Sequence, residues 1–187
     1  PRIAKAELSS NTVDFGADAL SVERILTNPG SDTLRWNFLE LYFPEWLTVD
    51  PLDGVLVMGE SQTITFHCDR TGLPIGNQSV EIQLVGGQIP LTVEVLALVE
   101  GAVLTAKNTV FEFGEEETQL QTTLSNTGNI PLEWQLEDAL PAWLSWDPAV
   151  SGSVPAGEEK QITIQADRSA LDFGTYSFST KLLSNAG

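Results

Sequence analysis

Residues 62–68, Gln-Thr-Ile-Thr-Phe-His-Cys, alternate between polar and apolar side chains. An apolar pattern with a period of two lines one face of a β-strand, whereas a helix needs a period of 3.6. The apolar set here is Ile64, Phe66 and Cys68. The segment is therefore predicted to be a half-buried strand that turns these three side chains toward an apolar core.

The same pattern returns 98 residues further along the chain, where Ile162, Ile164 and Ala166 take the apolar positions. This shift also superimposes Phe15-Gly16 on Phe113-Gly114, Asn28-Pro29-Gly30 on Asn126-Thr127-Gly128, Leu34-Arg35-Trp36 on Leu132-Glu133-Trp134, and Asp69-Arg70 on Asp167-Arg168. A shift of 97 aligns Pro44-Glu45-Trp46-Leu47 with Pro141-Ala142-Trp143-Leu144, and Asp50-Pro51 with Asp147-Pro148. The chain is thus interpreted as a tandem duplication, with domains at residues 1–100 and 101–187.

Further alternating segments lie near residues 34–38, 80–84 and 89–95, and turn signals separate them about every dozen residues. No stretch has a convincing amphipathic helix pattern. About seven short strands in a unit of roughly 95 residues indicate an immunoglobulin-like β-sandwich, although the Cys…Trp…Cys core of antibody domains is absent. The predicted fold class is all-β, with two tandem immunoglobulin-like sandwiches.

The second copy is expected to lack its last strand, because Gly187 aligns with Ile89 and nothing matches residues 89–99. Either the chain is cut here or another segment supplies the strand. An open sheet edge invites pairing with a neighbouring chain. We favour a cut, because the matching strand of the first copy leads straight into the second and would lead in the same way into a third.

Composition excludes several classes of function. The chain has 187 residues and a formal net charge of −17, which makes nucleic acid and anionic membrane surfaces poor partners. One His and one Cys leave most zinc, haem and triad chemistry without enough ligands or a base, so we expect neither cofactor nor metal site. No apolar run reaches the ~18 residues of a membrane span. Calcium stays open because Glu100 and residues 115–117 are acidic, although no Asp-x-Asp-x-Asp loop is present.

Catalysis is not expected. His67 and Cys68 form the obvious dyad, but adjacent residues of a strand point to opposite faces, and the second copy has Gln165 and Ala166 there. Glycoside hydrolysis needs two acids about 5 to 10 Å apart. The acids that recur in both copies stand at turns and strand ends, at Asp50, Asp69, Asp147 and Asp167.

The repeated elements named above resemble the BACON family of bacterial surface modules. Three further segments of the second copy share this resemblance: Ser151-Gly152, Ile162-Thr163 and Gly174-Thr175-Tyr176-Ser177. The first copy departs from the pattern at Asp53-Gly54 and at Gln78. The resemblance implies an immunoglobulin-like sandwich at the cell surface, outside the cell or in the periplasm, often beside glycan-degrading or adhesive domains. The family's sugar-binding label defines no site residue. Hydin-like modules share Phe-Gly and Asn-x-Gly, which leaves a cytoskeletal partner as a further analogy.

Sugar binding needs an exposed aromatic ring on which a pyranose can stack. Tryptophans that share a strand face with apolar neighbours are assigned to the core, namely Trp36, Trp134 and Trp146. The candidates for ligand binding are Trp46 and Trp143, which each follow a strand-start proline motif, and Tyr176. The alternative for all three is a structural role at the rim of the sandwich. For Tyr176 that role is a tyrosine bonded to the backbone.

Tyr42 and Phe43 occur in the first copy only, where the second copy has Ala139 and Leu140. Their loop is expected at the end of the sandwich from which the last strand leaves for the second domain. We interpret the pair as an interdomain contact, with an exposed aromatic ligand patch as the alternative.

The sequence therefore predicts a non-catalytic module pair that acts as spacer and recognition scaffold in a longer envelope or secreted protein. The expected partners are polysaccharide, another surface protein and adjacent domains of the same chain. Two alternatives remain open: a weak carbohydrate-binding module of a glycan-utilisation protein, and protein–protein adhesion through an open sheet edge.

Overall fold

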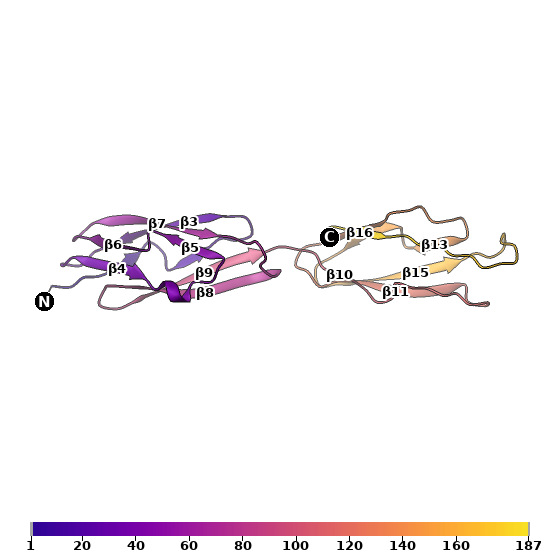
Figure 1. The fold of residues 1–187 in the computed structure, drawn as a ribbon, viewed down its shortest axis with the longest axis horizontal. Helices are drawn as coiled ribbons and strands as arrows, with labels where there is room; N and C mark the ends of the chain where they lie inside the picture. Colours follow the sequence, from indigo (N-terminus) through magenta and orange to yellow (C-terminus); the bar gives the residue numbers. More distant parts are fainter. Residues whose placement is uncertain (1, 187) are drawn as a thin grey trace. The chain divides into compact units, whose positions relative to one another are not determined.

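The computed structural model of the chain describes residues 2–186, with the side chain of Tyr42 left out. It contains two compact units, one ending at Val99 and the other beginning at Glu100 (Figure 1). Both units are built of strands, which confirms the predicted all-β class and the pair of sandwich modules. Among the described residues, no helix has the length and apolar composition needed to cross a membrane.

Unit 1 consists of two packed sheets. The first has the strand order β1-β3-β7-β5 and the second β2-β9-β8-β4-β6, and all pairings are antiparallel except β2 with β9. The elements are β1 (Glu7–Leu8), β2 (Thr12–Asp14), β3 (Ser21–Thr27), β4 (Leu34–Phe38), the 3-10 turn η1 (Glu40–Tyr42), β5 (Leu47–Asp50), β6 (Asp53–Leu56), β7 (Ser61–Cys68), β8 (Gly76–Val85) and β9 (Leu91–Val99).

The core of unit 1 lies between these sheets. Ile64 and Phe66 on β7 are fully buried, as the alternation predicts, and Trp36 and Phe38 reach them from β4 in the opposite sheet. The Phe38 ring stands edge-on to Phe66 at 5.9 Å between centroids. Edge-to-face aromatic pairs add about 0.5–1.5 kcal/mol beyond the burial of their area.

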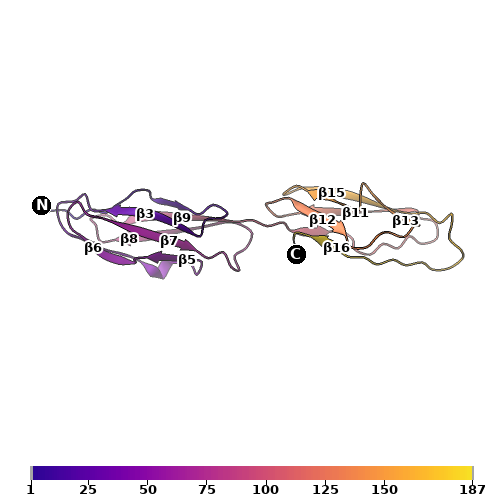
Figure 2. The same cartoon turned by 90° about the horizontal axis from the view of Figure 1, so that it is seen from above.

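Unit 2 repeats this plan with sheets β10-β11-β15-β13 and β14-β12-β16. Its strands are β10 (Leu104–Ala106), β11 (Gln119–Asn126), β12 (Leu132–Leu136), β13 (Leu144–Asp147), β14 (Ser151–Val154), β15 (Glu159–Ala166) and β16 (Leu182–Ser184). Strand β16 lies beside β12 (Figure 2) with Leu182 opposite Leu136, the register in which Leu84 of β8 stands opposite Phe38 of β4. β16 is thus the counterpart of the end of β8.

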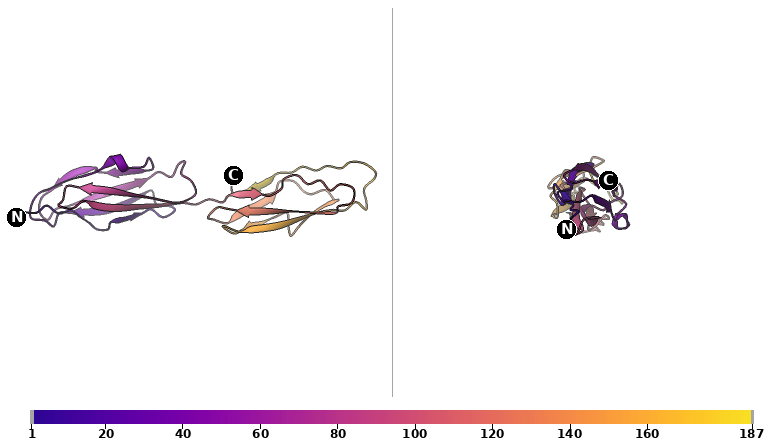
Figure 3. Two further views of the ribbon diagram at one scale, coloured as in Figure 1. Left: turned by 90° about the horizontal axis from the view of Figure 1, so that it is seen from below. Right: turned by 90° about the vertical axis from the view of Figure 1, so that its left-hand side faces the viewer.

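The second sheet is where the two units differ. In the described part of unit 2, no strand corresponds to β9, and residues 110–112, the counterparts of β2, form no strand. The two differences have one cause, since β2 is held in unit 1 by parallel pairing with β9. Residues 167–181 run along unit 2 outside any strand until β16 begins (Figure 3).

The Asn-x-Gly motif is a buried hydrogen-bonding hub. In unit 1 the Asn28 amide donates to the carbonyls of Asp32 and Leu56 at 2.8 and 2.9 Å, and its Oδ1 accepts from Gly30 N–H at 3.0 Å. In unit 2, Asn126 makes the same three kinds of bond, to Ile130, Val154 and Gly128. Both asparagines are fully buried. A buried amide is stable only when its hydrogen bonds are made, so this motif ties the turn to the sheet.

The glycine of the motif is required by close approach of another segment. A Cβ on Gly30 would lie 2.2 Å from the Ile3 carbonyl oxygen, and one on Gly128 would lie 2.2 Å from that of Gly101. No side chain fits at such a distance. The Asn-x-Gly repeat therefore packs the start of each unit against its own turn.

The Asp-Arg motif fixes the Phe-Gly loop. The Arg70 guanidinium donates to the carbonyls of Phe15, Gly16 and Ala19 and, through Nε at 3.1 Å, to that of Leu98 on β9. In unit 2, Arg168 donates to the matching loop at residues 113–117. The arginine of the Asp-Arg motif thus bonds within its own unit.

Replacing Asn28 by alanine leaves several buried backbone groups without a partner. We expect the free energy of unfolding of unit 1 to fall by about 3 kcal/mol, because each such group costs about 1–3 kcal/mol. Urea denaturation measures the loss. Asn77→Ala, at an exposed position of β8, serves as control and should change stability by no more than about 0.5 kcal/mol. Equal losses in the two variants would contradict the structural role of the hub.

Candidate functional site

The candidate site lies on unit 2, where β13 begins. The Leu144 N–H donates to the Pro141 carbonyl at 2.9 Å, which turns the chain into the strand, and Leu144 then packs against the core. Trp143, one residue earlier, faces away from the core and is half-exposed. Its carbonyl accepts from the Asp167 N–H at 2.8 Å, which holds the Trp143 backbone against the end of β15.

Tyr176 stands beside this tryptophan. The two ring centroids are 6.3 Å apart with the planes inclined by 59°, and 44 % of Tyr176 is exposed. Among the described residues, no hydrogen bond fixes its hydroxyl group. Tyr176 was expected either to bind a ligand or to bond the backbone. Within the described part of the chain it makes no bond to the backbone, and its ring stands beside that of Trp143.

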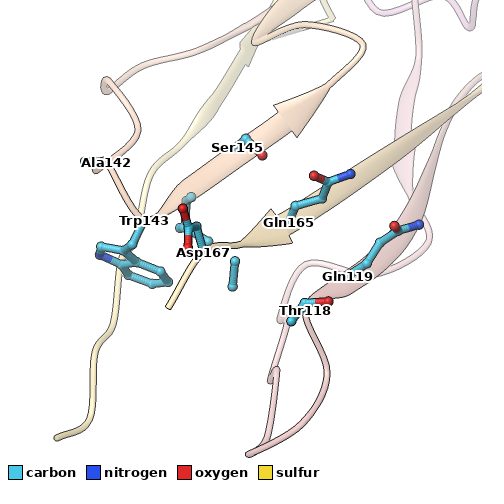
Figure 4. A pocket seen from close by; sticks show the side chains of 9 residues that line it. Thr118, Gln119, Ala142, Trp143, Ser145, Gln165 and Asp167 are labelled. Carbon is cyan, nitrogen blue, oxygen red and sulfur yellow. The ribbon is translucent and has the colours of Figure 1, made fainter. Parts of the chain in front are cut away.

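A row of polar side chains continues from the aromatic pair across the outer face of the sheet. Gln165 on β15 stands opposite Gln119 on β11 and opposite Ser145 on β13. With Thr118, Trp143 and Asp167 they line an open depression of about 430 Å³ (Figure 4). The depression therefore combines one aromatic face with amide, hydroxyl and carboxylate groups.

The carboxylate at this site is held in its charged form. Hydrogen bonds from Ser169, first from its backbone N–H at 2.9 Å and then from its side chain, lower the pKa of Asp167. Thr71 lowers the pKa of Asp69 in the same way in unit 1. A general acid must carry a proton at working pH, so neither residue suits the acid role of a glycosidase.

The groups that line this depression are of the kinds that can contact a sugar. An exposed indole offers a surface on which an apolar sugar face can stack, and neighbouring amides and hydroxyls supply donors and acceptors for sugar hydroxyls. The depression is open to solvent rather than enclosed, and small-ligand pockets gain affinity by burying most of the ligand. The site therefore suits weak binding.

The corresponding place in unit 1 is built differently. Trp46 packs against the core cluster, and the position of Tyr176 is taken by Gln78, whose amide donates to the Pro74 carbonyl at 3.0 Å. The residues of unit 1 that correspond to the polar row are Ser21, His67 and Thr48, which stand opposite one another on β3, β7 and β5. Trp46 thus has no tyrosine partner in this position, and of the three candidate residues the structure brings together only Trp143 and Tyr176.

Phe43 packs on the core of its own unit. Its ring lies 6.2 Å from that of Phe38 at an angle of 62°. The side chain of Tyr42 lies outside the described residues. The expected contact of Tyr42 and Phe43 with the second domain therefore stays a prediction.

His67 and Cys68 diverge as the strand geometry requires. His67 is exposed, whereas Cys68 is buried, with 5 % of its surface accessible. Burial raises the pKa of the Cys68 thiol, and the nearby charge of Arg70 offsets only part of that rise. Among residues 2–186, no three His, Cys, Asp or Glu side chains are arranged to hold a metal ion.

The polar row was not predicted from sequence. Its signal was available in the positions that alternate with the buried ones, since Gln165 lies between Ile164 and Ala166. What the sequence lacked was the cross-strand register, which places Gln119 and Ser145 on either side of Gln165. Polar residues on a solvent face are common, so the row becomes informative only beside Trp143.

The fold defines a class of module, an immunoglobulin-like β-sandwich that is present here in two copies. The family model described as "Viral BACON domain" matches residues 2–96 and again residues 103–184. The chain belongs to this family, which confirms the resemblance and the two-module organisation inferred from the repeat.

The solved structures that match this chain share little sequence with it. A protein of unknown function from Porphyromonas gingivalis W83 is 14 % identical with a TM-score of 0.43, over 87 % of this chain and 83 % of the other. The periplasmic chaperone SfaE is 13 % identical with a TM-score of 0.43, over 84 % and 87 %. The E. coli chaperone DraB is 9 % identical with a TM-score of 0.45, over 90 % and 88 %. No match was found among curated proteins.

The buried thiol of Cys68 should react with Ellman's reagent at pH 8 at least about tenfold more slowly in the native chain than in urea, because thiolate formation is disfavoured there. A chain with Thr48→Cys and Cys68→Ala moves the thiol to an exposed position of the neighbouring strand β5. This thiol should react fast without urea. Equal native rates for the two thiols would show that Cys68 is accessible and ionised.

Proposed function

We propose that the chain is a non-catalytic pair of modules that acts as a spacer and recognition scaffold in a larger, surface-exposed protein. One observation carries this proposal: the recurrent residues of the repeat bond within their own unit. Asn28 and Asn126 tie the turns, and Arg70 and Arg168 tie the Phe-Gly loops. A signature used for packing suits a building block that is repeated for its shape.

The duplication and the family support this function. A scaffold becomes longer when copies of a module are added. Each copy here has its own core. The family description is viral, which favours a virion or host-facing protein over the bacterial envelope suggested by the resemblance. In both settings we expect the modules outside the cytoplasm, beside other domains of a longer chain.

The scaffold function is tested by a search for turnover. We expect no release of product from chromogenic glycosides and esters above the rate in buffer, since Asp167 is charged at neutral pH and Cys68 is buried. Any release is compared with that of an Asp167→Asn chain. Turnover that disappears in this variant would overturn the non-catalytic assignment.

Weak carbohydrate binding by unit 2 is the second candidate. It is favoured by the Trp143–Tyr176 pair at 6.3 Å beside the polar row. The aromatic faces would stack on the sugar ring, while Gln119, Ser145 and Gln165 would bond its hydroxyls. Under this candidate function, the expected polysaccharide partner is the ligand of the depression.

Affinity electrophoresis on a panel of plant, host and bacterial-surface polysaccharides tests this candidate. We expect retardation on at least one glycan, reduced about tenfold or more by Trp143→Ala, because stacking on an exposed aromatic ring is worth roughly 1–3 kcal/mol. Phe173→Ala is the control, because Phe173 is fully exposed and does not line the depression. No retardation on any glycan, or an equal loss of retardation in both variants, would contradict carbohydrate binding at this site. Only the scaffold function would then remain.

A further inference from the structure

The polar row of the depression is the first of several rows on the outer face of the sheet β10-β11-β15-β13. The outward side chains of β11 and β15 stand opposite one another in pairs: Gln119 with Gln165, Gln121 with Thr163, Thr123 with Gln161, and Ser125 with Glu159. Each is exposed or partly exposed, whereas Ile162 and Ile164 between them are buried. Figure 4 shows the first pair near Trp143. The depression therefore lies at one end of a longer polar face.

The glutamines of this face occur in unit 2 only. They stand at four outward positions, where unit 1 has Ser21, Glu23, Thr63 and His67. Gln161 Nε2 donates to Gln121 Oε1 at 2.9 Å across the two strands. This bond orients both amides and leaves each of them further donors and acceptors. Because these side chains point away from the core, packing of the sandwich does not account for four different residues being replaced by one type.

The charges on this face are carboxylates. Glu159 accepts from Ser125 Oγ at 2.9 Å, and Asp147 on β13 stands opposite Thr163. The outward positions of β11, β13 and β15 hold no lysine or arginine, and Lys160 of β15 turns inward, with its Nζ 5.9 Å from the centroid of the Trp134 ring. The chain as a whole has a formal net charge of −17. An acidic polymer would be repelled here without an ion-pair partner, so the face suits an uncharged ligand.

A protein partner finds few anchors on this face. Cores of protein interfaces are apolar and rich in aromatic residues. The outward positions of β11, β13 and β15 hold no aliphatic or aromatic side chain. Ile25, which is 50 % exposed at the matching position of unit 1, is replaced by Thr123. Rows of amides and hydroxyls instead match the donors and acceptors along a sugar chain.

We propose that this face of unit 2 binds an uncharged, extended polysaccharide that lies along the strands. One sugar would stack on Trp143, and sugars further along the chain would be bonded by Gln121 and Gln161. The residue steps from Gln165 to Glu159 cover about 20 Å of strand at roughly 3.4 Å per residue, which leaves room for several sugars. The proposal rests on carbohydrate binding at the depression and adds the class of ligand and its direction.

The first test compares sugar chains of two lengths. NMR spectra of the 187-residue chain are titrated with cellobiose and cellohexaose, maltose and maltohexaose, and mannobiose and mannohexaose. In at least one series we expect the hexasaccharide to bind about tenfold more tightly or better, since two further side-chain hydrogen bonds are worth about that factor. The side-chain amide signals of Gln121 and Gln161 should shift with the hexasaccharide and not with the disaccharide.

The outcomes of this titration separate the two proposals. Equal affinities for both lengths, with shifts confined to the depression, would overturn the extended site while carbohydrate binding at Trp143 stands. No binding in any series, together with no retardation on the polysaccharide panel, would overturn both.

A pair of matched double variants locates the extended site. Gln121→Ala with Gln161→Ala should remove the gain in affinity with chain length. Glu23→Ala with Thr63→Ala changes the corresponding positions of unit 1 and should retain that gain. All four positions lie on outer faces, where substitutions usually change stability by no more than about 0.5 kcal/mol, so both variants should fold. Equal loss or equal retention in the two variants would contradict the assignment to unit 2.

Charge selectivity is tested on polysaccharides that share a backbone. Affinity electrophoresis compares hydroxyethyl cellulose with carboxymethyl cellulose, and dextran with dextran sulfate. We expect retardation on at least one uncharged member and none on its charged counterpart. Retardation on the charged members, or on no uncharged member, would overturn the proposal. So would a doubled mass in light scattering that Gln121→Ala with Gln161→Ala abolishes, because the face would then bind a second copy of the chain.

Discussion

Face-to-face packing of two sheets, each turning every second side chain inward, is the constraint on which the rest of this structure depends. It requires a complete inner face on both sheets, and unit 1 supplies one through Ile64 and Phe66 on one side and Val93 and Val95 on the other. Several features that recur in both copies support this packing. The buried asparagine and the strand-end arginine tie the loops so that the faces stay in register.

The candidate site of unit 2 depends in part on residues that differ between the copies. The shared asparagines and arginines bond within their own unit. Gln165, which replaces His67, lines the depression of unit 2, and Tyr176, which replaces Gln78, stands beside Trp143. β9 of unit 1 has no counterpart among the described residues of unit 2.

The fold could be predicted in detail because alternation and repetition are local signals. Ile64, Phe66, Ile162 and Ile164 are buried as their spacing requires. The candidate site was predicted only in part. Trp143 and Tyr176 were recognisable by residue type, but their contact and the polar row depend on cross-strand register and on the course of residues 167–181, which no local pattern encodes. The roles of Arg70 and Arg168 were also hidden, since the loop carbonyls that they bond lie over 50 positions away.

The central claim is that one sandwich is written twice, and that the copies differ where β8 of unit 1 pairs along its length while residues 174–181 of unit 2 form no strand. Native-state hydrogen exchange of the chain alone measures this directly. The account predicts the slowest exchange along β7 and β15, slow exchange along β8 of unit 1, and fast exchange at the matching residues 174–181 of unit 2. Equal protection of residues 76–83 and 174–181 in the isolated chain would contradict it.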